Sequence, residues 1–378
     1  AEKVSLRKGK EKMKTTIKSI AVALAFCAAA FLTVSAIIEN TAPNGSEKYI
    51  MRDYNGRIAV FVYGEDIAKQ GGIFGQFAGM KDEFPERVLD TPISETALVG
   101  AGVGAAIAGA KPVIDLHFAD FIGIAMDEVL NQMAKTHYMF GGQATMSLVL
   151  RAPDGLMKHG AAQHSQSLET WFTNIPGIRV VVPSTPANGK QLLKAAIKDP
   201  NPVIYFENKG LFPVKGDVPE DLPPIDLSRA EVVREGADVT LVSYGLMLTK
   251  ALAAADVARR EYGVSVEVID LRSITPLDMP TIYASVKKTG HLVIAHEAIK
   301  IGGVGGEIAA RVAENHFDYL RGPVLRVGAR FTPLPFSPVM EDFVLSGEKE
   351  ILDAVLAAAG KSAVDGADGA AGRAGEAA

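Results

Sequence analysis

Cysteine is almost absent from this chain, with Cys27 the single one in 378 residues. An internal disulfide and a cysteine-based zinc site are therefore excluded. An excess of positive charge is also missing, because the net charge is −5 although residues 1–18 carry seven lysines and arginines against two glutamates. The rest of the chain is strongly acidic, which argues against nucleic-acid binding by the folded part.

Motifs for phosphate binding and for common hydrolytic chemistry are missing as well. The chain has no Walker loop and no G-x-S-x-G nucleophile elbow. The glycine-rich string from Gly100 to Ala105 imitates a dinucleotide fingerprint, but the acid Asp115 follows too soon after it. His296-Glu297 opens like a zinc-protease motif, yet position 300 is a lysine, so a helix there would offer one histidine ligand only.

The longest apolar run lies near the amino terminus. Ile20–Ile38 carries no charge and follows a basic leader at residues 1–19, which is typical of a signal peptide or a membrane anchor. An alanine-rich helix packed on the first domain explains the same stretch. Both interpretations stay open for the segment at residues 20–40, and Met13, just ahead of it, suggests that residues 1–12 precede the native start.

Past residue 40, short apolar runs alternate with helical patterns. Buried strands are predicted at Ile58–Tyr63, Lys111–Asp115, Met146–Arg151, Arg179–Val182 and Val203–Glu207. Helices are predicted at Val99–Ala110, Phe121–Lys135, Leu168–Asn174 and Ala187–Lys198. This alternation is typical of an α/β fold, with a mostly parallel sheet and helices on both faces.

The alternation stops once and then restarts. A stretch rich in proline and glycine at residues 213–228 predicts a linker between a first domain at residues 48–212 and a second, smaller one at residues 229–359. Strands of the second domain are predicted at Val239–Ser243, Val264–Ile269, His291–Ala295 and Val324–Val327. The Ala/Gly-rich end, residues 360–378, is predicted to be disordered. The predicted fold is thus two consecutive three-layer α/β domains.

Three side chains of the first domain are candidates for chemistry. Glu95 follows Thr91, which can cap a helix, and Pro92, which suits a first helical position, so its carboxylate should lie near a first turn. An acid there also simply stabilises the positive end of a helix. Phe121 begins an apolar helix, where a core aromatic is the plain explanation. His164 lies in a polar loop of small residues between a strand and a helix, where functional residues are common.

The sequence strings around these candidates follow one another in an order that is informative as a set. They are GED (Gly64–Asp66), RVLDTPISE (Arg87–Glu95), FADF (Phe118–Phe121), AAQHSQS (Ala161–Ser167), VVVPSTP (Val180–Pro186), DPNPVIYFE (Asp199–Glu207), VEVIDLRSITPLD (Val266–Asp278) and HEAIKIGGVGGEIAARVAE (His296–Glu314). From about Ala59 to Ala357 the chain resembles the β subunit of the thiamine-diphosphate-dependent 2-oxo acid dehydrogenases. Pyruvate, branched-chain 2-oxo acid and acetoin dehydrogenase complexes use such a subunit. The resemblance implies a transketolase-like pyrimidine-binding domain followed by a transketolase C-terminal-like domain.

The resemblance also implies roles for single residues. Glu95 matches the carboxyl group that hydrogen-bonds the aminopyrimidine of thiamine diphosphate and so promotes deprotonation of its thiazolium. Phe121 matches the aromatic that stacks on the pyrimidine, and Glu65 matches a second acid linked to the site. His164, between Gln163 and Ser165, matches the histidine that orients the substrate carboxylate or transfers a proton during reductive acylation of a lipoyl group.

A cation site follows from the same resemblance. Some members of the family bind a monovalent cation such as potassium through carbonyl and side-chain oxygens. The matching positions here are Leu148, Ala196, Asp199 and Asn201.

The missing phosphate anchor implies a partner. Family relatives hold the cofactor's diphosphate through magnesium with a Gly-Asp-Gly motif and a downstream asparagine. Here Asp154-Gly155 follows a proline, and Asp365-Gly366 lies in the predicted tail. The resemblance therefore implies an α2β2 assembly whose α subunit supplies the magnesium ligands, and a dihydrolipoyl acyltransferase core that accepts the acyl group from a small 2-oxo acid. We expect a cytoplasmic protein, in contact with a membrane only if residues 20–40 are an anchor.

Three alternatives stay open at this point. The chain could serve an acetoin dehydrogenase, or be a non-catalytic assembly subunit of the same fold. It could also be an NAD-binding oxidoreductase that uses the glycines at Gly100–Gly104.

Overall fold

The computed structural model describes residues 60–222 and 225–361. The basic leader and the apolar segment at residues 20–40 lie outside them, as does the tail from residue 362 on. Within the described part of the chain, no helix has both the length and the apolar character that a membrane span needs.

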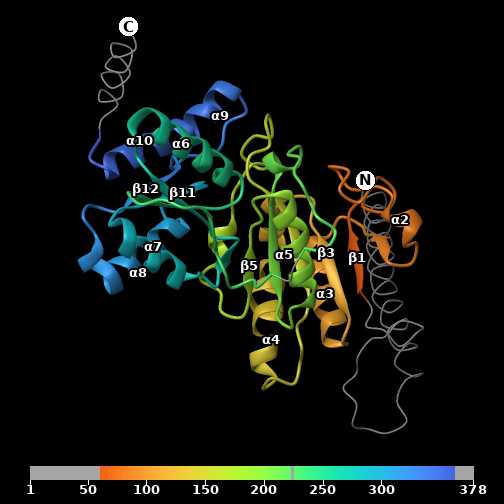
Figure 1. Ribbon diagram of the computed structural model, residues 1–378. Helices are drawn as coiled ribbons and strands as arrows, with labels where there is room; N and C mark the ends of the chain where they lie inside the picture. Colours follow the sequence, from red (N-terminus) through yellow and green to blue (C-terminus); the bar gives the residue numbers. More distant parts are fainter. Residues whose placement is uncertain (1–59, 223–224, 362–378) are drawn as a thin grey trace, which may run out of the picture. The chain divides into compact units, whose positions relative to one another are not determined.

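The first half of the described chain forms a seven-stranded sheet (Figure 1). Its strands are β1 (Val60–Gly64), β2 (Val88–Asp90), β3 (Lys111–Asp115), β4 (Val149–Asp154), β5 (Arg179–Val181), β6 (Val203–Asn208) and β10 (Ser273–Thr275). Their order is β10-β5-β6-β4-β3-β1-β2, and all neighbours are parallel except β10, which runs antiparallel to β5. The predicted parallel sheet is thus confirmed, and its last strand comes from the second half of the sequence.

Helices cover both faces of this sheet because its strands are apolar on both sides. Tyr63 and Ile114 belong to a core that includes apolar residues of α3 (Glu95–Ile107). Their neighbours Val62 and Val113 belong to another core with α5 (Pro186–Lys198). Successive residues of a strand face opposite sides, so the two helices lie on opposite faces.

The glycine-rich run from Gly100 to Gly104 lies inside α3. Its backbone N–H groups are therefore part of a helix interior, where they form helical hydrogen bonds. A Cβ at Gly102 would lie 2.4 Å from Cδ1 of Ile114, so this glycine lets the helix approach β3 closely. The run serves packing, and the geometry does not support a dinucleotide loop.

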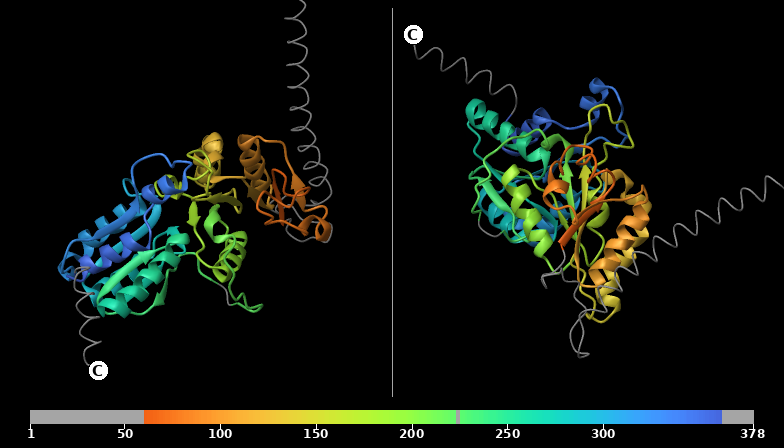
Figure 2. Two further views of the ribbon diagram at one scale, coloured as in Figure 1. Left: turned by 90° about the horizontal axis from the view of Figure 1, so that it is seen from above. Right: turned by 90° about the vertical axis from the view of Figure 1, so that its right-hand side faces the viewer.

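The second half forms a five-stranded sheet in the order β12-β11-β8-β9-β7. The strands are β7 (Glu231–Arg234), β8 (Val239–Ser243), β9 (Val266–Asp270), β11 (Leu292–Ile299) and β12 (Leu325–Ala329). Helices α6 (Leu246–Tyr262) and α10 (Glu348–Ala358) pack together on one face, and α7 (Met279–Thr289) and α8 (Val304–His316) on the other (Figures 1 and 2). The fold class predicted from the sequence is confirmed, whereas the predicted domain boundaries stay predictions.

Several helices differ from their predicted bounds. Helix α3 begins at Glu95 and not near Thr91, because the Thr91 backbone N–H still bonds the Gly64 carbonyl at 2.9 Å and so prolongs the pairing of β2 with β1. The Ser94 carbonyl accepts the first helical bond, from Leu98 N. The prediction that the Glu95 carboxylate lies in a first turn is nevertheless confirmed.

The helix predicted at Phe121–Lys135 is broken into three pieces. They are the 3₁₀ segment η1 (Ala119–Ala125), the π-helical segment η2 (Glu128–Met133) and the helix α4 (Ala134–Met139). The Ile124 carbonyl accepts a bond of 3.0 Å from the Thr96 hydroxyl, a tertiary contact made where an α-helix would continue its own ladder. The helix predicted at Leu168–Asn174 is only a short 3₁₀ turn, η3 (Glu169–Phe172).

The remaining elements are short. They are α2 (Met80–Glu83), α9 (Pro338–Val344), η4 (Lys209–Leu211) and η5 (Phe317–Tyr319).

Candidate active site

The carboxyl edge of the first sheet carries a cluster of polar and aromatic side chains. From β1 the chain reaches β2 on one side and then returns through α3 to β3 on the other. The strand order thus reverses beside β1, which is where open α/β sheets bind their ligands. Glu65 follows β1 directly, and His117 lies just beyond the end of β3.

Two acids and a histidine interact at this point. Glu65 is only 6% exposed, and its Oε2 lies 3.1 Å from Nδ1 of His117. Burial raises the pKa of the Glu65 carboxyl; the neighbouring His117 opposes this shift and Glu95 adds to it. Glu65 and Glu95 therefore share one electrostatic environment.

Glu95 is buried at the first position of α3, with 7% of its surface exposed. The next residue, Thr96, bonds the Ile124 carbonyl in η1, the segment that also contains Phe121. This bond ties the start of α3 to the aromatic segment. A buried acid and an aromatic ring are thereby held by neighbouring elements.

Three rings form the centre of the cluster. The imidazole of His164 lies 4.7 Å from the Phe118 ring and 5.6 Å from the Phe121 ring, between ring centres. Phe118 and Phe121 meet edge to face at 5.9 Å. Edge-to-face contacts of this kind fix ring orientation as well as position.

His164 belongs to a constrained loop between β4 and η3, residues 156–167, which we call the histidine loop. The Ser165 hydroxyl donates to the Met157 carbonyl at 3.2 Å and accepts from the Met157 backbone N–H at 3.4 Å. His159 and Ala161 have positive φ angles of 60° and 57°. Non-glycine residues keep such angles only where the surroundings hold them. Gln163 is exposed at the surface of the loop.

A buried ion-pair network supports the same sheet edge. Arg151, at 5% exposure, pairs with Asp115 and Glu207 at once. Burial raises the pKa of Asp115 to about 6, although the Arg151 guanidinium acts against this shift. Arg151 also lies 5.1 Å from the centre of the Phe77 ring. The three charges connect the neighbouring strands β3, β4 and β6.

The residues predicted to bind a monovalent cation are close neighbours. The Asp199 backbone N–H bonds the Ala196 carbonyl at 3.2 Å, and Asp199 Oδ1 accepts from Asn201 at 2.8 Å. The Leu148 carbonyl accepts from the Val203 backbone N–H at 3.0 Å, and Arg179 pairs with Asp199 Oδ2 at 2.9 Å. The cation site stays a prediction. Among residues 60–222 and 225–361, no group of three or more acids, histidines or cysteines is arranged to hold a metal.

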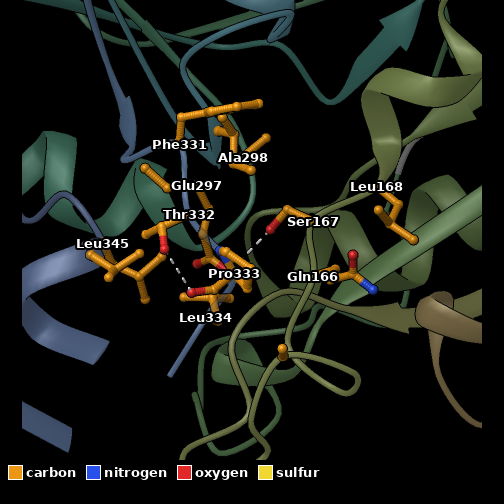
Figure 3. Close-up of a pocket in the computed structure, with 14 residues that line it drawn as sticks. Gln166, Ser167, Leu168, Glu297, Ala298, Phe331, Thr332, Pro333, Leu334 and Leu345 are labelled. Atoms are coloured by element: carbon orange, nitrogen blue, oxygen red, sulfur yellow. Dashed lines mark hydrogen bonds between the residues drawn. The ribbon is translucent and has the colours of Figure 1, made fainter. Parts of the chain in front are cut away.

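A cavity of about 350 Å³ adjoins the histidine loop (Figure 3). One wall contains Gln166, Ser167 and Leu168, and another contains Glu297 and Ala298 from β11. The lining is mostly apolar, with the Glu297 carboxylate as its acidic group. Glu95 and Phe121 are not among the lining residues.

The structure brings Glu65, Glu95, Phe121 and His164 to one edge of the sheet, while the four cation candidates lie elsewhere. Sequence reasoning missed His117 and Phe118, which link Glu65 to the rings through contacts of 3.1 Å and 6.3 Å. Their position just after a buried strand was the available signal.

Comparisons with known proteins agree with this architecture. Residues 47–215 match the family model described as the transketolase pyrimidine-binding domain, and residues 228–351 match the transketolase C-terminal domain. Among solved structures, a protein described as a split-gene transketolase, an inactive β4 tetramer, is similar with a TM-score of 0.65 and 25% identity over 80% of this chain and 92% of that one.

Curated relatives are more similar in sequence. The pyruvate dehydrogenase E1 component subunit beta of Rhizobium meliloti is 44% identical, over 79% of this chain and 65% of that protein. The acetoin:2,6-dichlorophenolindophenol oxidoreductase subunit beta of Bacillus subtilis is 44% identical over 81% of this chain and 93% of that protein. The 2-oxoisovalerate dehydrogenase subunit beta of B. subtilis is 40% identical over 76% and 88%. The chain therefore belongs to the family of β subunits of the thiamine-diphosphate-dependent 2-oxo acid and acetoin dehydrogenases, which combine a transketolase pyrimidine-binding domain with a transketolase C-terminal domain.

Proposed function

We propose that this chain is the β subunit of a heterotetrameric 2-oxo acid dehydrogenase, which oxidatively decarboxylates a 2-oxo acid and transfers the acyl group to a lipoyl group. The observation that carries the proposal is the buried Glu95 carboxylate at the start of α3, beside the ring cluster of Phe118, Phe121 and His164. Bound thiamine diphosphate would supply the nucleophilic carbon that attacks the substrate carbonyl.

The described residues fit the pyrimidine half of this cofactor. A heteroaromatic ring needs a flat apolar partner, which Phe121 offers, and a buried carboxyl group to bond a ring nitrogen, which Glu95 offers. Glu65 and His117 form a pair beside Glu95 that can share and move a proton near it. In this proposal His164 orients the substrate carboxylate or delivers a proton during acyl transfer.

The described residues do not fit the diphosphate half. Asp154-Gly155, the closest match to an anchoring motif, lies at the end of β4, whose last residue is Asp154, and a Cβ at Gly155 would lie 2.2 Å from Asn208 Nδ2. The same Cβ would lie 2.4 Å from Glu297 Oε1, and a carboxylate at this position would repel a phosphate. We infer that an α subunit holds the magnesium and the diphosphate, and that the open half-site becomes a closed cleft only in the α2β2 assembly. The split-gene transketolase, described as inactive in its β4 form, supports this inference.

Further partners and the location belong to the same proposal. A dihydrolipoyl acyltransferase core would receive the acyl group, and a potassium ion would bind near Leu148, Ala196, Asp199 and Asn201. Because lipoylated partners and coenzyme A are intracellular, we propose a cytoplasmic protein. Acetoin is the second candidate substrate, because the acetoin oxidoreductase subunit is as similar in sequence as the pyruvate dehydrogenase subunit.

Activity of the assembled enzyme tests the proposal. The chain is co-expressed with the α subunit encoded beside it, and reduction of an electron-accepting dye is followed with pyruvate, branched-chain 2-oxo acids and acetoin. We expect one substrate class to drive reduction only when both chains and thiamine diphosphate are present. Reduction by the isolated chain, or by neither preparation with any substrate, would contradict the proposal.

A further inference from the structure

A buried lysine lies over the Phe118 ring of the candidate site. Lys209 follows β6 directly, and only 7% of its surface is exposed. Its Nζ lies 5.4 Å from the centre of the Phe118 ring and has no hydrogen-bond partner among the described residues. An ammonium group over an aromatic face is attracted to it, and the attraction grows when water is excluded.

Three carboxyl groups act electrostatically on this ammonium without hydrogen-bonding to it. Burial lowers the pKa of Lys209, while the charges of Asp154, Asp120 and Glu297 act in the opposite direction. Burial also raises the pKa of Asp154 well above its usual range, and the nearby Glu169 adds to this shift. Acids gathered in a dry interior repel one another unless a cation lies among them. Lys209 is the cation that the structure places there.

Glu297 holds both ends of the histidine loop. Its Oε1 accepts the Leu156 backbone N–H at 2.7 Å at the start of the loop and the Ser167 hydroxyl at 3.4 Å at its end. The second contact is drawn as a dashed line in Figure 3. The same oxygen also accepts from Asn208 Nδ2 at 3.2 Å, one residue before Lys209.

Asp120 holds the loop from the other side. Its Oδ1 accepts the backbone N–H of Gln166 at 3.2 Å and the side-chain amide of Gln166 at 2.9 Å. The Gln166 carbonyl in turn accepts from Gly155 N at 2.9 Å, which closes the base of the loop. Gly155 has a φ of +72°, and a Cβ there would lie 2.4 Å from Glu297 Oε1. The base of the loop is therefore closely packed around these carboxylates.

We propose that Lys209 is a positioning residue for His164: its buried ammonium holds the Phe118 ring through a cation–π contact and offsets the charge of the Asp120 and Glu297 carboxylates that close the histidine loop. The Phe118 ring touches the imidazole at 4.7 Å, so Lys209 acts on His164 through the ring and through the loop at once. This inference rests on the role proposed for His164. Loss of Lys209 would leave the chain folded but let the imidazole drift, and a displacement of about 1 Å costs on the order of 10²-fold in rate.

A double-mutant cycle in the α2β2 enzyme tests the inference. Lys209→Met keeps most of the length of the side chain but removes its charge, and we expect kcat to fall about 10–100-fold with a smaller change in KM. In a His164→Ala background the same substitution should lower kcat less than about threefold, because its target is already gone. Lys209→Arg should restore part of the activity. Losses that simply multiply would overturn the inference.

Hydrogen exchange of the full-length chain gives a readout that needs no activity. In Lys209→Met, amides of residues 156–167 should exchange faster, while those of β8 and β11 keep their rates. Lys250→Met is the matched control, since Lys250 is partly buried and donates to the Ser346 carbonyl at 3.2 Å in the second sheet's domain. It should change neither the amide exchange rates of the histidine loop nor kcat. Unchanged loop exchange in Lys209→Met would contradict the inference.

Two further results separate the possible failures. If the wild-type assembly turns over no substrate, the proposed function fails, and loop exchange alone decides the role of Lys209. If Lys209→Met does not assemble, Asp120→Asn replaces it in the cycle, because an amide still accepts from Gln166 while its charge toward Lys209 is lost. A multiplicative loss for Asp120→Asn with His164→Ala would then overturn the inference.

Discussion

Replacing Glu95 by glutamine should reduce decarboxylation by the assembled enzyme by about 10²–10⁴-fold, the usual range for loss of a positioned acid or base. Glutamine keeps the size of the side chain and removes its ionisable proton. The residue is buried at the first turn of α3, beside Glu65 and the aromatic segment, so a change of proton transfer is expected without a change of packing. Dye reduction under saturating substrate and cofactor measures the effect.

Assembly must be preserved for this result to count. The α2β2 mass of Glu95→Gln should equal that of the wild type by light scattering. Glu83→Gln, a change of an exposed acid in α2, is the matched control and should leave turnover unchanged. Turnover of Glu95→Gln within about threefold of the wild type would remove Glu95 from the proposed chemistry.

Replacing Arg151 by methionine should lower the free energy of unfolding by about 3–5 kcal/mol, because it leaves two buried carboxylates without their cationic partner. Arg151 is 5% exposed and pairs with both Asp115 and Glu207. Burial already raises the pKa of Asp115 to about 6 with the guanidinium present. Without it, both acids will take up protons more readily in the folded state. The measurement is denaturant unfolding followed by circular dichroism.

The stability loss of Arg151→Met should depend on pH. An acid whose pKa is raised in the folded protein binds more protons folded than unfolded, so stability increases as pH falls through the folded pKa. The deficit of Arg151→Met should therefore be smaller at pH 5.5 than at pH 8. The control is Arg234→Met, which breaks a pair whose acid, Asp256, is exposed at the surface, and it should change stability little. Equal losses for the two variants would contradict a buried network.

Strands were easier to predict than helices in this chain, for a physical reason. Buried parallel strands are short apolar runs, and β3 and β8 have the predicted bounds, Lys111–Asp115 and Val239–Ser243. The run from Phe121 to Lys135 has a helical pattern too, but it forms a 3₁₀ segment, a π-helical segment and a short helix, and the Ile124 carbonyl near the end of the first segment accepts a tertiary bond from Thr96. β10 could not be predicted, because three residues carry no periodic signal and its partner β5 lies about 90 residues earlier.

The sequence predicts the main residues of the candidate site, but it does not predict the residues that hold them in place. Glu95, Phe121 and His164 stand in strings whose order resembles one family, although each alone would pass as a helix-end acid, a core aromatic and a loop histidine. Lys209 and Glu297 lie far along the chain from the loop that they hold, and no local pattern connects them. Only the pairing of β4 with β6 and the position of β11 bring them to Gly155 and the histidine loop.

Calorimetric titration of thiamine diphosphate with magnesium tests the central claim most directly, since that claim is a half-site completed by a partner. The α2β2 assembly should bind the cofactor saturably, and Glu95→Gln in the same assembly should bind it with altered affinity. The isolated chain should show no saturable binding, because the proposal assigns the groups that hold the magnesium and the diphosphate to the α subunit. Binding of thiamine diphosphate by the isolated chain as tightly as by the assembly, or binding of NAD in its place, would contradict the account.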